Sequence, residues 1–281
     1  MLNNEITLVV FTCEGREHLI LKTINSFKAY CDISFNKTVI AIDGDFNFSS
    51  LSSISPDLLI QFPKRNGYVN SINSILKNID TNYFFWLEDD WTFHQPLNLA
   101  NKFNLLKNHD DWAELVFSKY GTLEDKYKGN PINNNLYLSP FGFSANPCLC
   151  NTKHIKEAFT SMTFANKGSV LGEDGFENYL TKYFDKRGIK CVIEDPQEGS
   201  VITHEGDLES TPREWHMTSS LEHKSDTYLA VFPKPSIARK IKTLIKLWIV
   251  FFKLSISQFY NRKIYDYSFR IIMTSKKNFE D

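Results

Sequence analysis

Three consecutive carboxylates, Glu88, Asp89 and Asp90, end an apolar run that begins at Tyr83. Carboxylates at the end of a buried strand are costly unless a cation or hydrogen bonds compensate them, and their oxygens suit a hard divalent ion such as Mg²⁺ or Mn²⁺. Because side chains alternate along a strand, Glu88 and Asp90 are expected to point one way and Asp89 the other. We interpret the triplet as a metal–diphosphate site. The alternative, a solvated acidic loop, is disfavoured by the apolar lead-in and the flanking tryptophans.

Apolar runs in the first third of the chain predict a parallel sheet. Four of them suit buried strands, and two stretches between them carry apolar residues at helical spacing. The order strand–helix–strand–strand–helix–strand predicts a three-layer α/β fold with a mostly parallel sheet. Such sheets bind ligands at the carboxyl ends of their strands, so the polar segments that follow the strands should share one site. Those segments are 12–16, 43–45, 64–67 and 88–90.

The rest of the chain carries weaker signals. Residues 118–147 are rich in Asn, Gly, Pro and aromatics, which indicates loops that shape a second-substrate pocket. Asp174 stands just before a predicted helix whose aromatic inner face begins at Phe176. A short strand is expected over 200–203, and it ends at His204.

Length and composition fit one large α/β domain, alone or with an appendage. The 281 residues are 42% hydrophobic and 23% charged, and the net charge of −1 gives no reason to expect a nucleic-acid partner. The five cysteines lack a disulfide or zinc spacing, and the N-terminus lacks the basic and apolar segments of a secretory signal. We therefore expect reduced thiols and a cytoplasmic location.

The C-terminal part of the chain is strongly basic, whereas the rest is acidic. From Lys234 onward there are eleven Lys/Arg and three Asp/Glu, a net charge of +8, which leaves −9 for residues 1–233. Over 236–260 apolar residues recur near helical spacing, and the longest apolar run, 247–252, is far below the roughly 20 residues of a spanning helix. A basic amphipathic helix suits an anionic membrane surface, and packing on the body or on a dimer partner is the alternative. We expect a body followed by a basic helical tail, 234–281, in peripheral contact with the inner face of the membrane.

The order of these pieces resembles the GT-A glycosyltransferases, in particular their family 2 group. In that family a first strand ends in a Thr-containing turn, a second in Asp-Gly, and a loop with Asn and Gly opens a helix bearing Asn. A fourth strand ends in the acidic DXD motif, and an Asp at a helix start and a His follow. The matching residues are Thr12 to Arg16, Asp43-Gly44, Asn66-Gly67 with Asn73, Glu88 to Asp90, Glu173-Asp174 and His204.

The chain departs from the family pattern in two places. The acidic triplet begins with Glu88, and the first turn reads Thr-Cys-Glu-Gly-Arg where the family often has Thr-Tyr-Asn-Arg.

The resemblance implies an α/β GT-A fold with a mixed, mostly parallel sheet flanked by helices. It implies a nucleotide-sugar half at about 1–95 and an acceptor half at about 96–233, to which the helical tail would be a C-terminal extension. The activity implied is that of a metal-dependent, inverting glycosyltransferase of hexosyltransferase type. The donor would be a nucleotide sugar and the acceptor a glycan or a lipid-linked molecule, as in surface polysaccharide synthesis.

The resemblance also assigns roles to residues. Asp90 and His204 are the expected ligands of Mn²⁺ or Mg²⁺, which would stabilise the diphosphate leaving group, and Glu88 would assist through water. Asp174 is the expected catalytic base, which takes the proton of the acceptor hydroxyl. The residues expected to contact the donor are Thr12, Glu14, Arg16, Asp43, Arg65, Asn73, Glu88 and Asp89.

Each of these assignments has a structural alternative. Asp174 is also suited to capping the helix that follows it, and Asp43 is suited to forming a turn with the glycine after it. His204 is equally suited to a structural role, and Arg16 and Arg65 to an exposed surface.

Other functions fit the sequence less well. A haloacid-dehalogenase-type phosphatase needs Asp-x-Asp after the first strand, where this chain has Thr-Cys-Glu-Gly. A nucleotidyltransferase usually has a Gly-rich, basic first loop, which is absent here. The remaining alternative is a catalytically degenerate GT-A domain that binds a sugar nucleotide or a membrane without transfer.

Overall fold

A computed structural model describes most of the first 205 residues of the chain. The chain divides into two compact units, Met1–Ser225 and Asp226–Asp281. Of the second unit, Ile245, Lys246 and Trp248 are described, and all three are helical and exposed. The rest of the predicted tail and the predicted boundary after residue 233 lie outside the described residues, so both stay predictions. The described residues are 5–47, 54–64, 67–133, 135–162, 176–196, 199–205, 245, 246 and 248.

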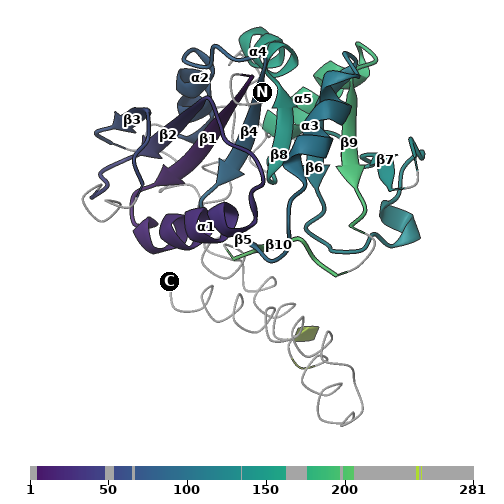
Figure 1. The fold of residues 1–281 in the computed structure, drawn as a ribbon, viewed down its shortest axis with the longest axis horizontal. Coiled ribbons are helices and arrows are strands. Elements are labelled where there is room, and N and C mark those ends of the chain that lie inside the picture. The colour runs from purple at the N-terminus through teal and green to yellow at the C-terminus, as the bar shows by residue number, and fades with distance from the viewer. Residues whose placement is uncertain are drawn as a thin grey trace. The chain divides into compact units, whose positions relative to one another are not determined.

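A sheet of eight strands forms the centre of the first unit, in the order β3-β2-β1-β4-β8-β6-β9-β7 (Figure 1). Strands β1 to β4, β6 and β9 run in one direction, and β8 and β7 run against them. The carboxyl ends of the six parallel strands therefore lie along one edge of the sheet. The bounds are β1 Ile6–Cys13, β2 Lys37–Asp43, β3 Leu58–Phe62, β4 Tyr83–Glu88, β6 Trp112–Phe117, β7 Leu136–Leu138, β8 Cys148–Asn151 and β9 Lys190–Glu194.

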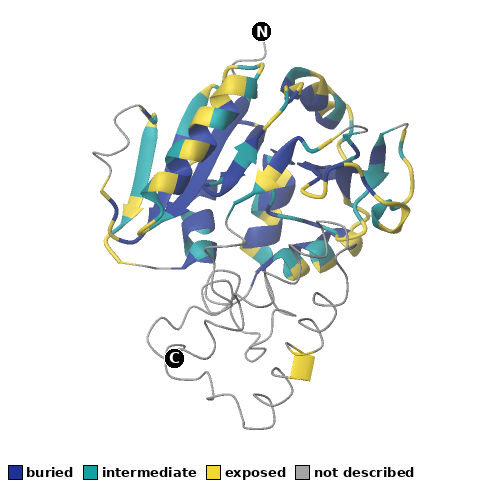
Figure 2. Ribbon diagram, turned by 90° about the horizontal axis from the view of Figure 1, so that it is seen from below, coloured by how far each residue is buried: buried dark blue, intermediate teal, exposed yellow. Residues whose placement is uncertain are grey.

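Helices cover both faces of this sheet. Alternate residues of β1 point to opposite faces: Leu8 and Val10 pack with the apolar sides of α1 and α3, whereas Val9 and Phe11 pack with α2, α4 and α5. The central strands are buried and the outer faces of the helices are exposed, whereas the edge strands β3 and β7 are half-buried (Figure 2). The helices are α1 Glu17–Tyr30, α2 Tyr68–Leu76, α3 Leu99–Lys107, α4 Thr152–Ser161, α5 Phe176–Asp185 and the 3₁₀ turn η2 Asp125–Tyr127.

The predicted fold class, an α/β fold with a mixed, mostly parallel sheet flanked by helices, is confirmed. The four predicted N-terminal strands and the two helices between them are present, although α2 ends at Leu76 rather than near Ile79. The region 118–147, predicted as loops, contains η2 and β7 as well. Two short strands, β5 (Trp91–Phe93) and β10 (Ile202–His204), pair antiparallel in a second sheet beside the carboxyl edge. No helix within the described ranges combines the length and apolarity needed to cross a membrane.

One carboxylate lies inside the core, away from the acidic triplet. Glu114 of β6 is fully buried, and its Oε1 accepts a hydrogen bond of 3.0 Å from the backbone N–H of Ser144. Burial raises the pKa of Glu114 well above its ordinary value of 4.5. The folded protein therefore keeps a proton on Glu114 at pH values where the unfolded chain has released it, and stability falls as the pH rises above that ordinary value.

We expect Glu114→Gln to make the fall in stability between about pH 5 and pH 8 shallower. Gln keeps an oxygen for the Ser144 N–H but carries no ionisable proton. The melting temperature measured across this range tests the prediction, with the exposed Asp111→Asn as the control that leaves the slope unchanged. An unchanged slope in Glu114→Gln would contradict it.

Candidate active site

The acidic triplet lies in the turn between β4 and β5. Strand β4 ends at Glu88, so Asp89 and Asp90 belong to the turn, and strand alternation does not govern their directions. Their side chains are nevertheless buried, with residue exposures of 4% and 6%. A pair of buried carboxylates in a turn requires compensating groups, and these come from three other segments of the chain.

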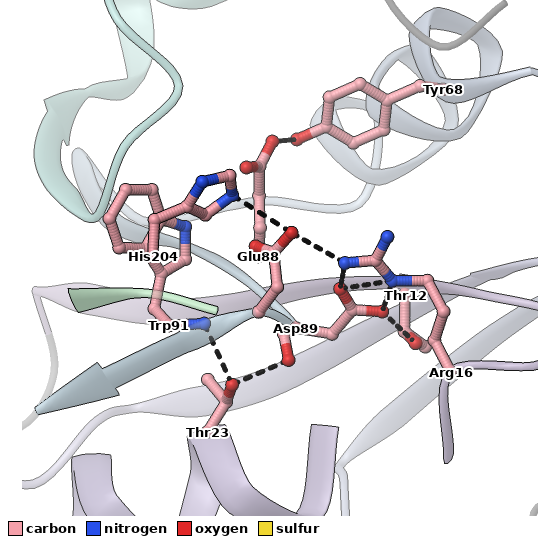
Figure 3. Close-up of polar contacts among 9 residues, drawn as sticks. Thr12, Arg16, Thr23, Tyr68, Glu88, Asp89, Trp91 and His204 are labelled. Carbon is pink, nitrogen blue, oxygen red and sulfur yellow. Dashed lines mark hydrogen bonds and ion pairs between the residues drawn. The ribbon is translucent and has the colours of Figure 1, made fainter. Parts of the chain in front are cut away.

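Asp89 is held by the turn that follows β1. Thr12 Oγ1 donates a hydrogen bond of 2.6 Å to Asp89 Oδ2, and Arg16 Nε donates to Oδ1 and Oδ2 at 2.9 and 3.1 Å (Figure 3). The backbone of the turn is fixed as well, because Thr23 Oγ1 of α1 donates to the Asp89 carbonyl at 2.6 Å and accepts from the Trp91 N–H at 3.1 Å. Asp89 therefore joins the ends of the neighbouring strands β1 and β4.

Asp90 lies between a guanidinium and an imidazole. Its Oδ2 is 2.6 Å from Arg16 Nη2 and 3.1 Å from His204 Nε2 (Figure 3). The ring of His204 lies over Trp91 with centroids 4.5 Å apart, and the Glu205 N–H donates to the Asp90 carbonyl at 2.7 Å. The other carboxylate oxygen, Asp90 Oδ1, is buried and has no hydrogen-bond partner among the described residues. A buried acceptor without a protein partner is uncommon, and a bound water, ion or ligand can supply the missing partner.

The side chain of Glu88 points toward Tyr68, at the start of α2. Its carboxylate accepts a hydrogen bond from the hydroxyl of Tyr68 (Figure 3). The same hydroxyl accepts one from Trp86 Nε1 at 3.2 Å. Tyr68 is the first residue of α2, so this chain of hydrogen bonds ties that helix to the end of β4.

Glu88 and Asp90 differ in protonation. Burial raises the pKa of Glu88 to about 8, and the charge of Asp90 adds to this effect. Burial also acts to raise the pKa of Asp90, but the hydrogen bond and charge of His204 and the charge of Arg16 outweigh it, so the Asp90 pKa is lowered. Asp90 is therefore the anionic oxygen donor at neutral pH.

The end of β2 lies beside this network. Asp43 Oδ2 accepts a hydrogen bond of 3.0 Å from the Gly67 N–H, and the Asp43 carbonyl accepts one of 3.1 Å from the Glu14 N–H. Glu14 Oε2 is 3.4 Å from the Asp45 N–H. Asp43 thus links the β1–α1 turn to the start of α2, where Gly67 has a φ of +90° that favours glycine.

The structure brings most of the predicted site residues to one edge of the sheet. Thr12, Arg16, Asp89, Asp90 and His204 are joined by direct contacts. Glu14 and Asp43 adjoin them, Glu88 turns toward Tyr68, and Asn73 lies within α2. The predicted donor-contacting Arg65 and the predicted base Asp174 lie outside the described residues, so both assignments stay predictions.

Sequence reasoning missed three residues of this network: Thr23, Tyr68 and Glu205. Tyr68 directly follows the Asn-Gly pair that opens the predicted helix. This position in the sequence could have identified it as a residue beside the strand-end site. Thr23 and Glu205 carried no such signal, because their contacts depend on how α1 and β10 pack.

The arrangement offers two protein donors to a divalent ion. Among the described residues no three of His, Cys, Asp and Glu are grouped as a ready-made ligand set. The unpartnered Asp90 Oδ1, with His204 beside the same carboxylate, nevertheless fits a Mg²⁺- or Mn²⁺-type site. Such ions commonly take only one or two protein ligands and complete their shell with substrate phosphates and water.

No family model and no curated protein matches the chain. Among solved structures it resembles S. aureus TarS 1-349 at 13% identity and a TM-score of 0.48, covering 73% of this chain and 61% of that one. The same TarS segment in complex with UDP gives 13% identity, a TM-score of 0.47 and coverages of 75% and 62%. A mycobacterial protein gives 14% identity, a TM-score of 0.48 and coverages of 72% and 67%.

This chain therefore spans less than two thirds of the TarS structures that it matches. Similarity at this level carries no conclusion about function, and the fold assignment rests on the strand order and directions of the sheet itself.

We expect Arg16→Met to lower the free energy of unfolding by about 3–5 kcal/mol, because it leaves Asp89 and Asp90 buried without their cation. Adding Asp89→Asn to this variant should recover part of the loss. Urea denaturation at neutral pH measures both effects.

The matched control is Lys107→Met, which removes an exposed ion pair of 2.6 Å with Glu5 and should cost less than about 1 kcal/mol. Equal, small losses in Arg16→Met and Lys107→Met would show that the buried ion pair does not hold the two turns together.

Proposed function

We propose that the chain is a glycosyltransferase of GT-A type that moves a sugar from a nucleotide-sugar donor to a glycan or lipid-linked acceptor. The observation that carries the proposal is the convergence of Thr12, Arg16, Asp90 and His204 at the carboxyl edge of a parallel sheet, with Asp90 Oδ1 buried and unpartnered. Ligands of open α/β sheets bind at this edge.

The order of the strands supports a donor site on one side of β4. The diphosphate would lie at the β4–β5 turn, where Asp90 and His204 would hold Mn²⁺ or Mg²⁺ and Glu88 would assist through water. When bound, the ion supplies positive charge to the leaving diphosphate. The nucleoside would extend toward the ends of β1 and β2, where Asp43 and Glu14 lie and Arg65 and Asn73 are the other predicted contacts.

The acceptor would approach from the other side of β4, where β8, β6 and β9 lie. Transfer needs a base that takes the proton of the attacking hydroxyl, and Asp174 is proposed for this role. An attack of this kind on the face opposite the leaving group inverts the anomeric centre.

A location at the inner face of the membrane is part of the proposal. The basic stretch 236–260 would bind anionic lipid headgroups, and Ile245 and Trp248, which are 55% and 68% exposed, would enter the interface. This arrangement would place the transferase close to a lipid-linked acceptor. Surface polysaccharide synthesis is the process that such an enzyme would serve.

A catalytically degenerate binding domain is the second candidate, and one observation favours it. Arg16 contacts both Asp89 and Asp90 in the described structure, so a cation already neutralises the acidic turn. In a domain of this kind the nucleotide sugar would bind without being cleaved.

A panel of nucleotide sugars, measured by thermal shift and by hydrolysis with and without Mn²⁺, tests the proposal. We expect one nucleotide class to raise the melting temperature by about 5–10 °C at about 100 times its Kd, only with the metal present. Asp90→Asn should remove both the shift and the hydrolysis, because it removes the anionic oxygen donor.

The matched control is Asp80→Asn, an exposed residue before the amino end of β4, which should behave as the wild type. Stabilisation without hydrolysis or transfer would favour the degenerate binding domain. No metal-dependent shift with any nucleotide sugar would overturn both candidates.

A further inference from the structure

We propose that three aromatic residues on the acceptor side, Tyr120, Tyr127 and Phe141 (the aromatic platform), bind a sugar ring of the acceptor glycan. Within the described part of the first unit, the exposed large hydrophobic side chains are Tyr120 at 48% and Phe141 at 43%. These two residues contact each other although 21 positions separate them in the chain. The role of the glycan as acceptor rests on the proposed function, whereas glycan binding can be tested independently of it.

The three rings form one cluster. The rings of Tyr120 and Tyr127 are stacked, with centroids 5.0 Å apart and planes 11° apart. The ring of Phe141 is tilted against both, at centroid distances of 5.8 Å from Tyr120 and 5.7 Å from Tyr127. Because two of these residues are exposed, the cluster presents a contiguous apolar surface to solvent that costs free energy unless a ligand covers it.

A pyranose fits this surface better than a lipid tail or an apolar peptide. One face of the sugar consists of C–H groups, which pack on the negative face of an aromatic ring, while the hydroxyls at its rim stay in water. Lysine ammonium groups lie over two of the rings: Lys119 Nζ is 5.5 Å from the Tyr120 centroid, and Lys126 Nζ is 4.6 Å from the Tyr127 centroid. Exposed rings with exposed lysine side chains over them suit a ligand that is both apolar and polar.

The backbone around Tyr120 is fixed in a tight turn. The buried Ser118 accepts a hydrogen bond of 3.2 Å from the Tyr120 N–H and donates one of 2.8 Å to the Gly121 carbonyl. Gly121 has a φ of +69°, and a Cβ there would lie 2.8 Å from the Gly199 carbonyl oxygen. Both facts require glycine at this position, so the turn that presents Tyr120 is preformed.

Phe141 is held in a comparable way by helix α5. Gly142 has a φ of +69°, and a Cβ there would lie 2.1 Å from Thr181 Cγ2. The next residue, Phe143, donates its N–H to Thr181 Oγ1 at 3.0 Å, and the Ala145 N–H donates to the half-buried Glu177 at 2.7 Å. Rigid aromatic side chains on fixed turns lose little conformational entropy when they bind.

The platform lies on the side of the site that the donor leaves free. Tyr120 follows β6, which is parallel to β4, so it lies along the sheet edge that carries Asp90. Strand β6 and the predicted donor contacts at the ends of β1 and β2 lie on opposite sides of β4 in the sheet order. A glycan stacked on the platform would therefore reach toward the β4–β5 turn from the acceptor side.

The test is binding to a printed array of α- and β-linked hexose and N-acetylhexosamine oligosaccharides, followed by saturation-transfer NMR on the oligosaccharide that binds. We expect the wild type to bind, and the double variant Tyr120→Ala/Phe141→Ala to lose about tenfold or more of that affinity. Tyr120→Phe should keep it, because the ring face remains. Tyr30→Ala, at the end of α1, is the control that loses a tyrosine elsewhere and should leave binding unchanged.

Three outcomes would overturn the inference. They are no glycan binding by the wild type, unchanged glycan binding in the double variant, and a change from dimer to monomer in light scattering of that variant with glycan binding unaffected. The metal-dependent thermal shift with nucleotide sugar separates this inference from the proposed function. If no donor stabilises the wild type but the double variant loses glycan binding, the platform stands and the transferase proposal fails.

Discussion

The contact of Arg16 with both carboxylates of the β4–β5 turn is the interaction on which the rest of the site depends. One guanidinium, on the turn after β1, binds Asp89 at 2.9 Å and Asp90 at 2.6 Å. Both acids are buried, so without this cation the turn would be strongly disfavoured. With Asp89 bound on one side, Asp90 is directed toward His204 of β10 and keeps one oxygen unpartnered. The network therefore gives the site one structural acid and one acid suited to binding a ligand.

The sheet gives this turn two different neighbours. On one side of β4 the parallel strands β1 and β2 end in polar turns, and on the other side β8 runs antiparallel before β6 and β9 resume the common direction. This divides the edge into a part proposed for the nucleotide and a part proposed for the acceptor.

Much of the fold and part of the site are predictable from local sequence. Long apolar runs predicted β1 to β4, and the rule for strand ends placed Thr12, Asp43 and Asp90 along one edge.

Strand β8, only four residues long, was not predicted, because a segment that short has no period to recognise. The pairing of β5 with β10 depends on tertiary packing between segments more than 100 residues apart. The role of Arg16 as counterion was also missed, since sequence cannot show which turns face each other. Within the described part of the first unit, Trp86, Trp91 and Trp112 are buried in the core, whereas Tyr120 and Phe141 are exposed.

Anomalous diffraction from crystals grown with Mn²⁺ and a nucleoside diphosphate tests the central claim most directly. The account predicts one strong manganese peak within coordination distance of Asp90, with the diphosphate oxygens completing its shell and Arg16 still on Asp89. A manganese peak away from the β4–β5 turn, or a nucleotide bound elsewhere than at the carboxyl edge of the sheet, would contradict it.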